Sequence, residues 1–467
     1  MRDLLILFMV VGSIPLIIMR PWIGIIMWCW LGFMNPHRLT WGFAYDFPFA
    51  QVIALVTMGA ILISKEKKHI EFTPLLGIWC AWILWMCLST YFAIDPDTTT
   101  RDFDRMIKTM LFAFLTILLI NRENRVRALV WITVFSLGFF GVKGGIFSIL
   151  TGGNFLFWGP PGSFIEGNNE IGLALVMTIP MIFYLYLTEA NKWIRRALLG
   201  TMGLSMLAVL TTHSRGAFLA LGAMVAFLWL KSRRKVLTGV LLIAALPLLI
   251  NFMPESWVDR MWSIRDYESD GSANGRINSW WFAYYLALDH PLFGGGFGTF
   301  TKSLFMVYAP NPTDHHDAHS IYFEVLAEHG FVGLGLFLTL GGLSILTAGS
   351  TVRRCKSVPE LMWIADLNRL TQVSLVGYAV GGAFLGLAYF DLYYHYVAII
   401  VTTRQLARMR LKQMEEGTWP KAPRVQDTSA PTDRKVFGKP KKDQPKKDDA
   451  KSPSRPRMGD RFPSATR

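Results

Sequence analysis

Long apolar runs separated by polar connectors cover most of the chain up to about residue 403. An apolar helix of about 20 residues crosses a bilayer hydrocarbon core of about 30 Å. The runs lie at residues 4–19, 21–34, 47–64, 74–93, 106–120, 128–150, 170–188, 196–212, 215–230, 236–252, 331–349, 370–390 and 391–403. This pattern predicts an all-α, polytopic integral membrane protein with about 12 transmembrane helices.

The longest polar interruption between apolar runs is the loop 253–318. Within it, residues 254–262 and 276–288 have helical composition, and residues 271–275 are predicted to form a flexible turn between two short helices. The glycine-rich stretch 294–298 precedes no clear helix start, so it favours close backbone packing over a phosphate-binding loop. A loop of this length between spans is a place where function is commonly carried.

The helix that follows the loop has two compatible placements. A span that starts at Ser320 puts Glu324 and Glu328 on one face, with Glu328 deep enough to need a partner. A span limited to residues 331–349 is long enough by itself and leaves both glutamates in the outer interface at little cost. We favour the second placement, and both placements put His319 at the mouth of the membrane domain.

Basic residues mark every second connector, which predicts the orientation of the chain. The Lys/Arg clusters lie near residues 65–68, 122–127, 192–196, 231–235 and 353–356. Short loops rich in Lys and Arg stay in the cytoplasm. The opposite connectors, at residues 35–46, 92–105, 151–169 and 253–318, are therefore predicted to be extracytoplasmic.

The formal net charge of +14 belongs mainly to the C-terminal end of the chain. Residues 404–467 hold 18 Lys or Arg and 8 Asp or Glu, a net charge of +10. We predict that residues 411–467 form a disordered basic cytoplasmic tail, drawn to anionic membrane lipids rather than to nucleic acid. The four cysteines show no Cys-x-x-Cys spacing, so the sequence indicates neither a disulfide framework nor a zinc site.

Two arginines of the predicted outer surface are candidate anion contacts. Arg215 lies at a tight junction between two spans, where a cation needs a partner. An arginine that extends to lipid phosphates is an equally good explanation for it. Arg276 lies in the first turn of a predicted helix, where a cation is unfavourable against the helix dipole, so a role other than helix stability is indicated.

Three histidines lie at the end of the loop, at positions 315, 316 and 319. One interpretation is a zinc or manganese site, because His315 and His319 are spaced i, i+4 and two aspartates lie beside them. The surrounding Pro/Asn/Thr-rich segment does not promise the ordered supporting groups that such a site needs. We favour His319 as a metal-free general base, with no cofactor.

Four motifs in fixed order resemble the O-antigen ligase and polysaccharide polymerase superfamily over residues 195–350. They are Ser214-Arg215-Gly216-Ala217, Gly275-Arg276 with Trp280, Gly294 to Gly298 with Phe300, and His319-Ser320-x-Tyr322 followed by Glu328-x-Gly330. Residues 20–24 and 32–39 are similar to the branch of exosortase-associated O-glycosylation ligases. Ser320 departs from the superfamily, which commonly has asparagine there. The resemblance divides the chain into N-terminal transmembrane helices (1–190), a ligase-like membrane core (191–410) and the tail.

The resemblance implies an inverting glycosyl transfer at the outer face of a bacterial cytoplasmic (inner) membrane. A glycan carried on a polyprenyl diphosphate, such as undecaprenyl diphosphate, passes to an acceptor hydroxyl on a protein, a lipid or another glycan. Arg215 and Arg276 would hold the diphosphate, His319 would be the catalytic base, and Glu328 and Tyr322 would support the site.

Two alternatives to a ligase stay open. One is a polysaccharide polymerase of the same superfamily, which would use the same donor and the same base. The other is a transporter of a lipid-linked or polar substrate. The sequence lacks matched broken helices in two halves, which argues against transport.

Overall fold

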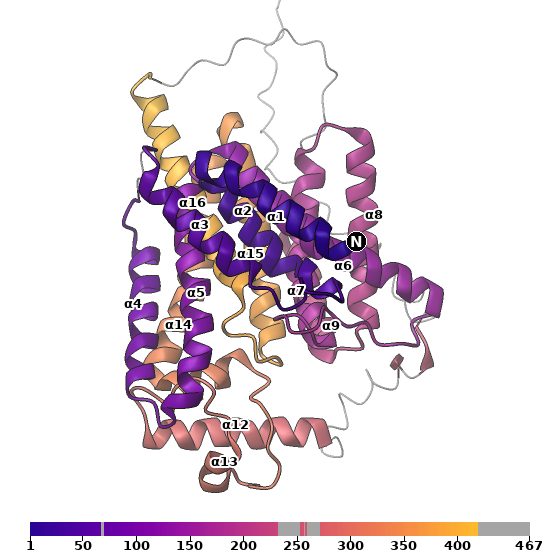
Figure 1. The fold of residues 1–467 in the computed structure, drawn as a ribbon, viewed down its shortest axis with the longest axis vertical. Coiled ribbons are helices and arrows are strands. Elements are labelled where there is room, and N and C mark those ends of the chain that lie inside the picture. The colour runs from indigo at the N-terminus through magenta and orange to yellow at the C-terminus, as the bar shows by residue number, and fades with distance from the viewer. Residues whose placement is uncertain (67–69, 232–252, 256, 259–270, 419–467) are drawn as a thin grey trace, which may run out of the picture.

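The computed structural model describes residues 1–66, 70–231, 253–255, 257–258 and 271–418 (Figure 1). Every regular element in these residues is a helix, and no strand occurs among them. The first nine helices are α1 (Arg2–Met19), α2 (Trp22–Met34), α3 (Phe49–Ile63), α4 (Pro74–Tyr91), α5 (Pro96–Leu119), α6 (Glu123–Thr151), α7 (Asn168–Thr188), α8 (Lys192–Thr211) and α9 (Arg215–Lys231). The apolar run 236–252 lies outside the described residues.

The described residues from 271 onward form five further α-helices, of which α13 is short. They are α12 (Gly271–Asp289), α13 (Lys302–Tyr308), α14 (Ile321–Cys355), α15 (Met362–Gly382) and α16 (Asp391–Glu415). Short 3-10 turns lie at Pro36–Leu39 and Pro359–Leu361. Because α16 runs to Glu415, residues 411–415 are helical, and the predicted tail begins too early by these five positions. The remainder of the tail, from residue 419, lies outside the described residues.

The predicted all-α, polytopic membrane fold is confirmed, whereas the count of about 12 transmembrane helices stays a prediction. Within the described part of the chain, α1, α4, α6, α7, α8 and α14 are long and apolar enough to cross a bilayer, and α2, α3 and α9 are shorter apolar helices. Large apolar side chains are exposed on these helices, for example Phe8 (76%), Leu62 (85%) and Leu150 (80%). Surfaces of this kind are unfavourable in water and favourable in lipid.

Helix α7 lies at the centre of the bundle, and its residues from Ile171 to Met181 are all buried. It packs against α6, α8, α9 and α15, while α4 packs against α14. Gly141 and Gly145 let α6 approach α8, since a Cβ on Gly141 would lie 2.0 Å from Oγ of Ser205. One hydrophobic core crosses the predicted boundary at residue 190, so the two parts pack as one body.

Local capping moves some helix ends away from the predicted apolar runs. The Asp95 side chain accepts hydrogen bonds from the backbone N–H groups of Asp97 and Thr98, and Pro96 occupies the first helical position. Helix α5 therefore begins at Pro96, and most of the predicted connector 92–105 is helical.

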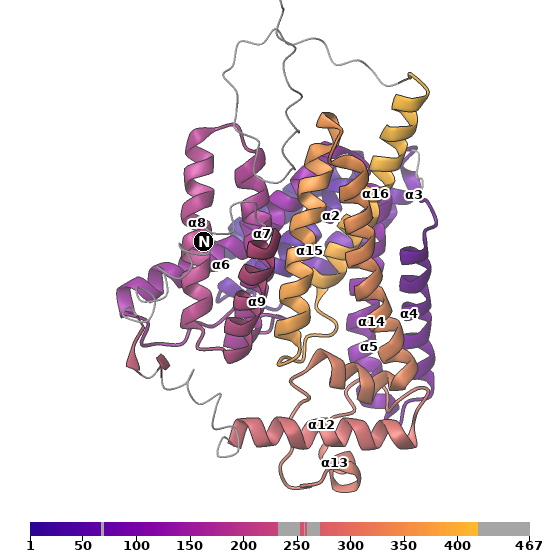
Figure 2. The ribbon, with the colours of Figure 1, turned by 180° about the vertical axis from the view of Figure 1, so that it is seen from behind.

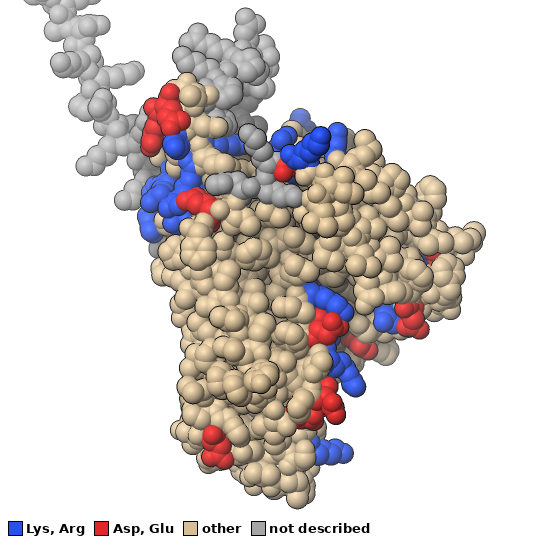
Figure 3. Space-filling view, turned by 60° about the vertical axis from the view of Figure 1, so that its left-hand side comes forward, with Lys and Arg blue, Asp and Glu red and all other residues tan. Residues whose placement is uncertain are grey.

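The two ends of the bundle differ in charge. Four ion pairs lie near the predicted cytoplasmic clusters. Arg125–Glu66 and Arg127–Glu189 start from α6, and Arg408–Glu71 and Arg410–Glu123 start from α16. Lys and Arg gather at this basic end, and a broad surface below them has no charged side chains (Figure 3). Helix α12 lies across the opposite end, roughly at right angles to α5 and α14 (Figures 1 and 2).

The α12 end has a small hydrophobic core of its own. Phe282 and Leu286 of α12 pack with Phe305 of α13 and Ala327 of α14, and all four side chains are fully buried. Residues 271–275, predicted as a flexible turn, form the first turns of α12. This prediction was wrong because tertiary packing overrides the weak helix propensity of the glycines.

Helix α14 bears on both predicted placements of its span. It begins at Ile321 and continues to Cys355, with one non-helical residue, Gly330 (φ 67°, ψ −171°). The favoured placement expected Glu328 to be solvated and therefore to cost little. The residue is only 5% exposed, so its carboxylate is not solvated. The partners that the other placement requires are present, as described below.

Candidate active site

His319 lies in the irregular segment 309–320, which connects α13 to α14. Its backbone is left-handed (φ 44°), a conformation that non-glycine residues adopt uncommonly. Its neighbours Ala318 and Ser320 are buried, whereas the His319 side chain is half-buried. The imidazole is thus held in place by its neighbours while it remains accessible from outside.

Helix α12 holds this segment by direct hydrogen bonds. The indole N–H of Trp280 donates to the carbonyl of Ala318 (2.9 Å), and the Trp280 ring stacks on Phe323 with centroids 5.0 Å apart. Ser279 Oγ donates to the carbonyl of His316 (3.1 Å). A rigid support of this kind, one residue before His319, is what a positioned base needs.

Asn278 and Gly275 complete the contact between α12 and the segment. The Asn278 side-chain amide donates to the carbonyls of Asn311 and Asp314, both at 2.9 Å, and accepts from the backbone N–H of Asn311 at 2.8 Å. A Cβ on Gly275 would lie 2.6 Å from Cδ2 of His316, so the start of α12 and the His316 side chain approach closely there. The predicted motif of Gly275, Arg276 and Trp280 is therefore one helix face packed on the histidine segment.

Arg276 interacts electrostatically with His319 and with Glu170, a residue in the first turn of α7. Burial lowers the pKa of His319 below its ordinary value, the positive charges of Arg276 and His316 lower it further, and Asp317 opposes the shift. This shift favours the neutral imidazole, which is the form that accepts a proton. Glu170 was missed from the sequence as a member of this charge cluster, since only tertiary packing brings the start of α7 near Arg276.

Arg215 is the first residue of α9 and is half-buried. The tight turn before it is fixed from two sides: His213 Nε2 lies 2.9 Å from the carbonyl of Gly153, and the Asn168 amide donates to the carbonyl of Thr212 (2.8 Å). His213 has a left-handed backbone (φ 52°). The predicted tight junction is confirmed.

The connector 383–390 extends from the Arg215 turn to His319. A Cβ on Gly216 would lie 3.1 Å from Cβ of Phe384, and one on Gly386 would lie 3.8 Å from the backbone N of His319. The structure thus brings Arg276 and His319 together and places Arg215 at the same end of the bundle. The action of the two arginines as a pair stays a prediction.

The metal interpretation rested on a helical spacing that the structure does not have. Segment 309–320 is irregular, and His315 Nε2 lies 2.9 Å from the carbonyl of Phe300. His316 pairs with Asp314 at 2.7 Å. Among the described residues, no group of three or more His, Cys, Asp or Glu side chains is arranged to hold a metal ion.

The candidate supporting residues make structural contacts. Tyr322 Oη donates to the carbonyl of Ala379 (2.8 Å) and so ties α14 to α15. Glu328 accepts from the backbone N–H of Gly298 (2.8 Å) and from the Tyr389 hydroxyl. The same hydroxyl lies 2.8 Å from Nε2 of His329. Glu328 therefore has the partners that a buried carboxylate requires.

The glycine-rich turn exchanges backbone hydrogen bonds with the break in α14. The N–H groups of Gly295 and Gly296 donate to the carbonyls of Ala327 (2.8 Å) and Glu328 (3.0 Å). The N–H of Phe331 donates to the carbonyl of Pro291 (2.9 Å). The turn thus satisfies carbonyls that the helix break leaves without intrahelical partners. Close backbone packing, as predicted, is confirmed, and these N–H groups are not available to a phosphate.

Two protein-family models match the chain. Residues 200–338 match a family model described as O-Antigen ligase, and residues 1–190 match a family of unknown function. No curated protein matches the chain. The first match covers the C-terminal part of α8, then α9, α12, α13, the segment with His319 and the start of α14. The resemblance to the O-antigen ligase superfamily is confirmed, whereas the exosortase-associated branch is not.

Proposed function

We propose that this membrane protein, whose residues 200–338 match the O-antigen ligase family, transfers a glycan from a polyprenyl diphosphate to an acceptor hydroxyl, with inversion at the anomeric carbon. The observation that carries the proposal is the placement of His319. It is half-buried, α12 holds the segment beside it, and it lies close enough to Arg276 for the positive charge to act on the imidazole. The reacting groups lie at the α12 end, opposite the basic end (Figure 2).

In the proposed reaction, neutral His319 removes the proton from the acceptor hydroxyl. The hydroxyl oxygen attacks the anomeric carbon of the glycan, and the bond from that carbon to the diphosphate oxygen breaks. Polyprenyl diphosphate leaves with the electron pair. Arg276 and Arg215 bind the diphosphate oxygens and stabilise the charge that develops on them. No nucleotide is required, because the lipid diphosphate is already an activated leaving group.

Substitution of His319 tests the role of the base. We expect His319→Gln to insert normally and to lower the transfer rate by about 10² to 10⁴, the contribution of a general base. His316→Gln is the matched control, since His316 lies in the same segment and is more exposed. Equal rates in the two variants would remove His319 from the mechanism. Purified enzyme should also keep its activity in EDTA, and a complete loss there would show that the reaction depends on a metal.

The two arginines are tested by charge-conserving changes. Arg215→Lys and Arg276→Lys should each lower activity about tenfold or more, because an ammonium does not reproduce the planar fork of a guanidinium. Arg101→Lys, at an exposed position on α5, serves as the control. Full activity in both test variants would exclude the arginines from the donor site.

Reporter fusions test the orientation. A reporter inserted at Thr313, in the irregular segment, should be exported, while one at Gly417, after α16, should stay in the cytoplasm. The same location for both would show that the topology is wrong. The acceptor class follows from what accumulates in a deletion strain: unglycosylated protein, unligated lipid, or unpolymerised repeat units.

A further inference from the structure

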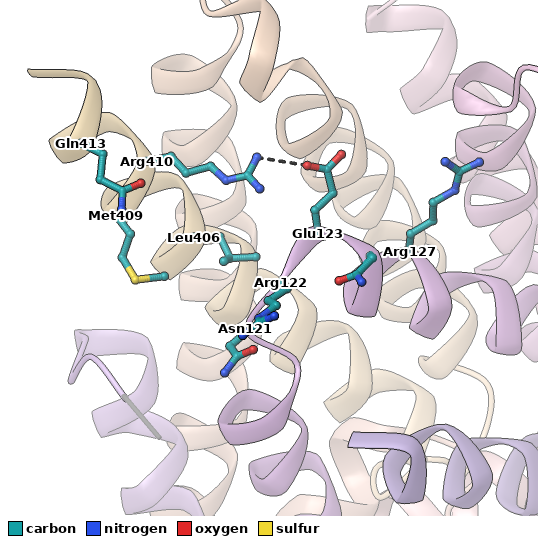
Figure 4. A pocket seen from close by; sticks show the side chains of 9 residues that line it. Asn121, Arg122, Glu123, Arg127, Leu406, Met409, Arg410 and Gln413 are labelled. Carbon is teal, nitrogen blue, oxygen red and sulfur yellow. Dashed lines mark hydrogen bonds and ion pairs between the residues drawn. The ribbon is translucent and has the colours of Figure 1, made fainter. Parts of the chain in front are cut away.

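A hollow of about 560 Å³ opens at the basic end, between the start of α6 and the last turns of α16 (Figure 4). Its polar wall includes Arg122, Glu123, Arg127 and Arg410, and Leu406 and Met409 of α16 add an apolar wall. The hollow lies at the end of the molecule opposite the His319 site, so the proposed transfer reaction does not account for it.

The charged side chains of the hollow carry an excess of positive charge, three guanidiniums against one carboxylate. Arg410 pairs with Glu123 (3.1 Å), and Arg127 pairs with Glu189 (2.8 Å) beyond the hollow. The Arg122 side chain is exposed and makes no hydrogen bond or ion pair within the described part of the chain. Arg122 is therefore the guanidinium best placed to bind an incoming anion.

The start of α6 adds to this preference for an anion. Arg122 is the N-cap residue of a 29-residue helix and gives it no side-chain cap hydrogen bond. The first N–H groups of a helix lack intrahelical partners and carry partial positive charge. The Arg122 guanidinium, the α6 start and Arg410 thus surround one space (Figure 4).

We infer that this hollow binds the phosphate of an anionic membrane lipid, with the headgroup on the arginines and the start of an acyl chain against Leu406 and Met409. The apolar wall favours a lipid over a free anion. The chain's own C-terminal segment does not fit the hollow, because residues 419–467 hold 14 Lys or Arg and only 6 Asp or Glu. A bound lipid would join α6 to α16.

Native mass spectrometry of the full-length protein tests the inference, with phosphatidylglycerol or phosphatidylcholine added to the detergent solution. We expect tighter retention of phosphatidylglycerol, and Arg122→Gln should weaken it by about three- to tenfold, the loss of one exposed charge-assisted contact. Arg196→Gln, an exposed arginine at the start of α8 outside the hollow, should leave retention unchanged. The same loss in both variants, or in neither, would overturn the inference.

Two further measurements separate specific lipid binding from other outcomes. Glu123→Gln removes the one carboxylate of the hollow, so it should strengthen retention, an effect opposite to that of Arg122→Gln. Inorganic phosphate should not displace the lipid at equal concentration. Full displacement would overturn the lipid assignment and show that the hollow serves a soluble phosphate.

Discussion

Replacement of Gly330 by alanine tests whether the break in α14 is required by the fold. Gly330 has φ 67° and ψ −171°, a region that is essentially restricted to glycine. A Cβ there would lie 2.5 Å from the carbonyl oxygen of Leu292 and 2.6 Å from that of Pro291, and neither backbone atom can move freely. Backbone strain costs about 1–3 kcal/mol and overpacking about 1–3 kcal/mol, so the sum is about 2–6 kcal/mol.

The assay is thermal unfolding of the purified protein in detergent, followed by tryptophan fluorescence. Gly335→Ala is the matched control, because Gly335 lies in the same helix and a Cβ there meets nothing within 4 Å. Alanine in a helix interior is more favourable than glycine by about 0.5–1 kcal/mol. We therefore expect Gly330→Ala to melt well below wild type and Gly335→Ala at or slightly above it. Equal melting of both variants and wild type would refute the reasoning.

Two further predictions concern the site and its support. Loss of the positive charge in Arg276→Gln should raise the pKa of His319, so the acid limb of kcat/KM should move to higher pH, separately from any loss of rate. An unmoved limb would contradict the coupling. Tyr389→Phe removes the hydroxyl that contacts the buried Glu328 and His329, so it should cost about 1–3 kcal/mol of stability. Tyr91→Phe, at an exposed position, is the control and should show no measurable loss of stability by thermal unfolding.

Most helices are predictable from the sequence, because an apolar run close to the bilayer thickness leaves the backbone no alternative to a helix. Helices α1 to α9 begin and end within a few residues of the predicted runs, except where a cap extends them, as Asp95 does for α5. Helix α13 was missed because it is a single short helix of seven residues in the polar loop.

The site was predictable in part, for a different reason. Arg276 and His319 are chemically unusual at their positions, and the structure brings them close enough for the charge of Arg276 to act on the imidazole. The burial of Glu328 was missed because its partners come from residues 298 and 389, far from it in sequence. Glu170 shows the same difficulty, since its approach to Arg276 depends on how α7 packs in the bundle.

The small hydrophobic core at the α12 end determines how the large loop can be studied and re-engineered. Phe282 and Leu286 share that core with Ala327, which belongs to the membrane helix α14. A recombinant fragment that ends before α14 would leave one side of this core open to water, so we expect the excised loop to misfold or aggregate. Grafting the loop onto a related scaffold to exchange substrate preference would likewise require the first turns of α14, through Gly330, to be transferred with it.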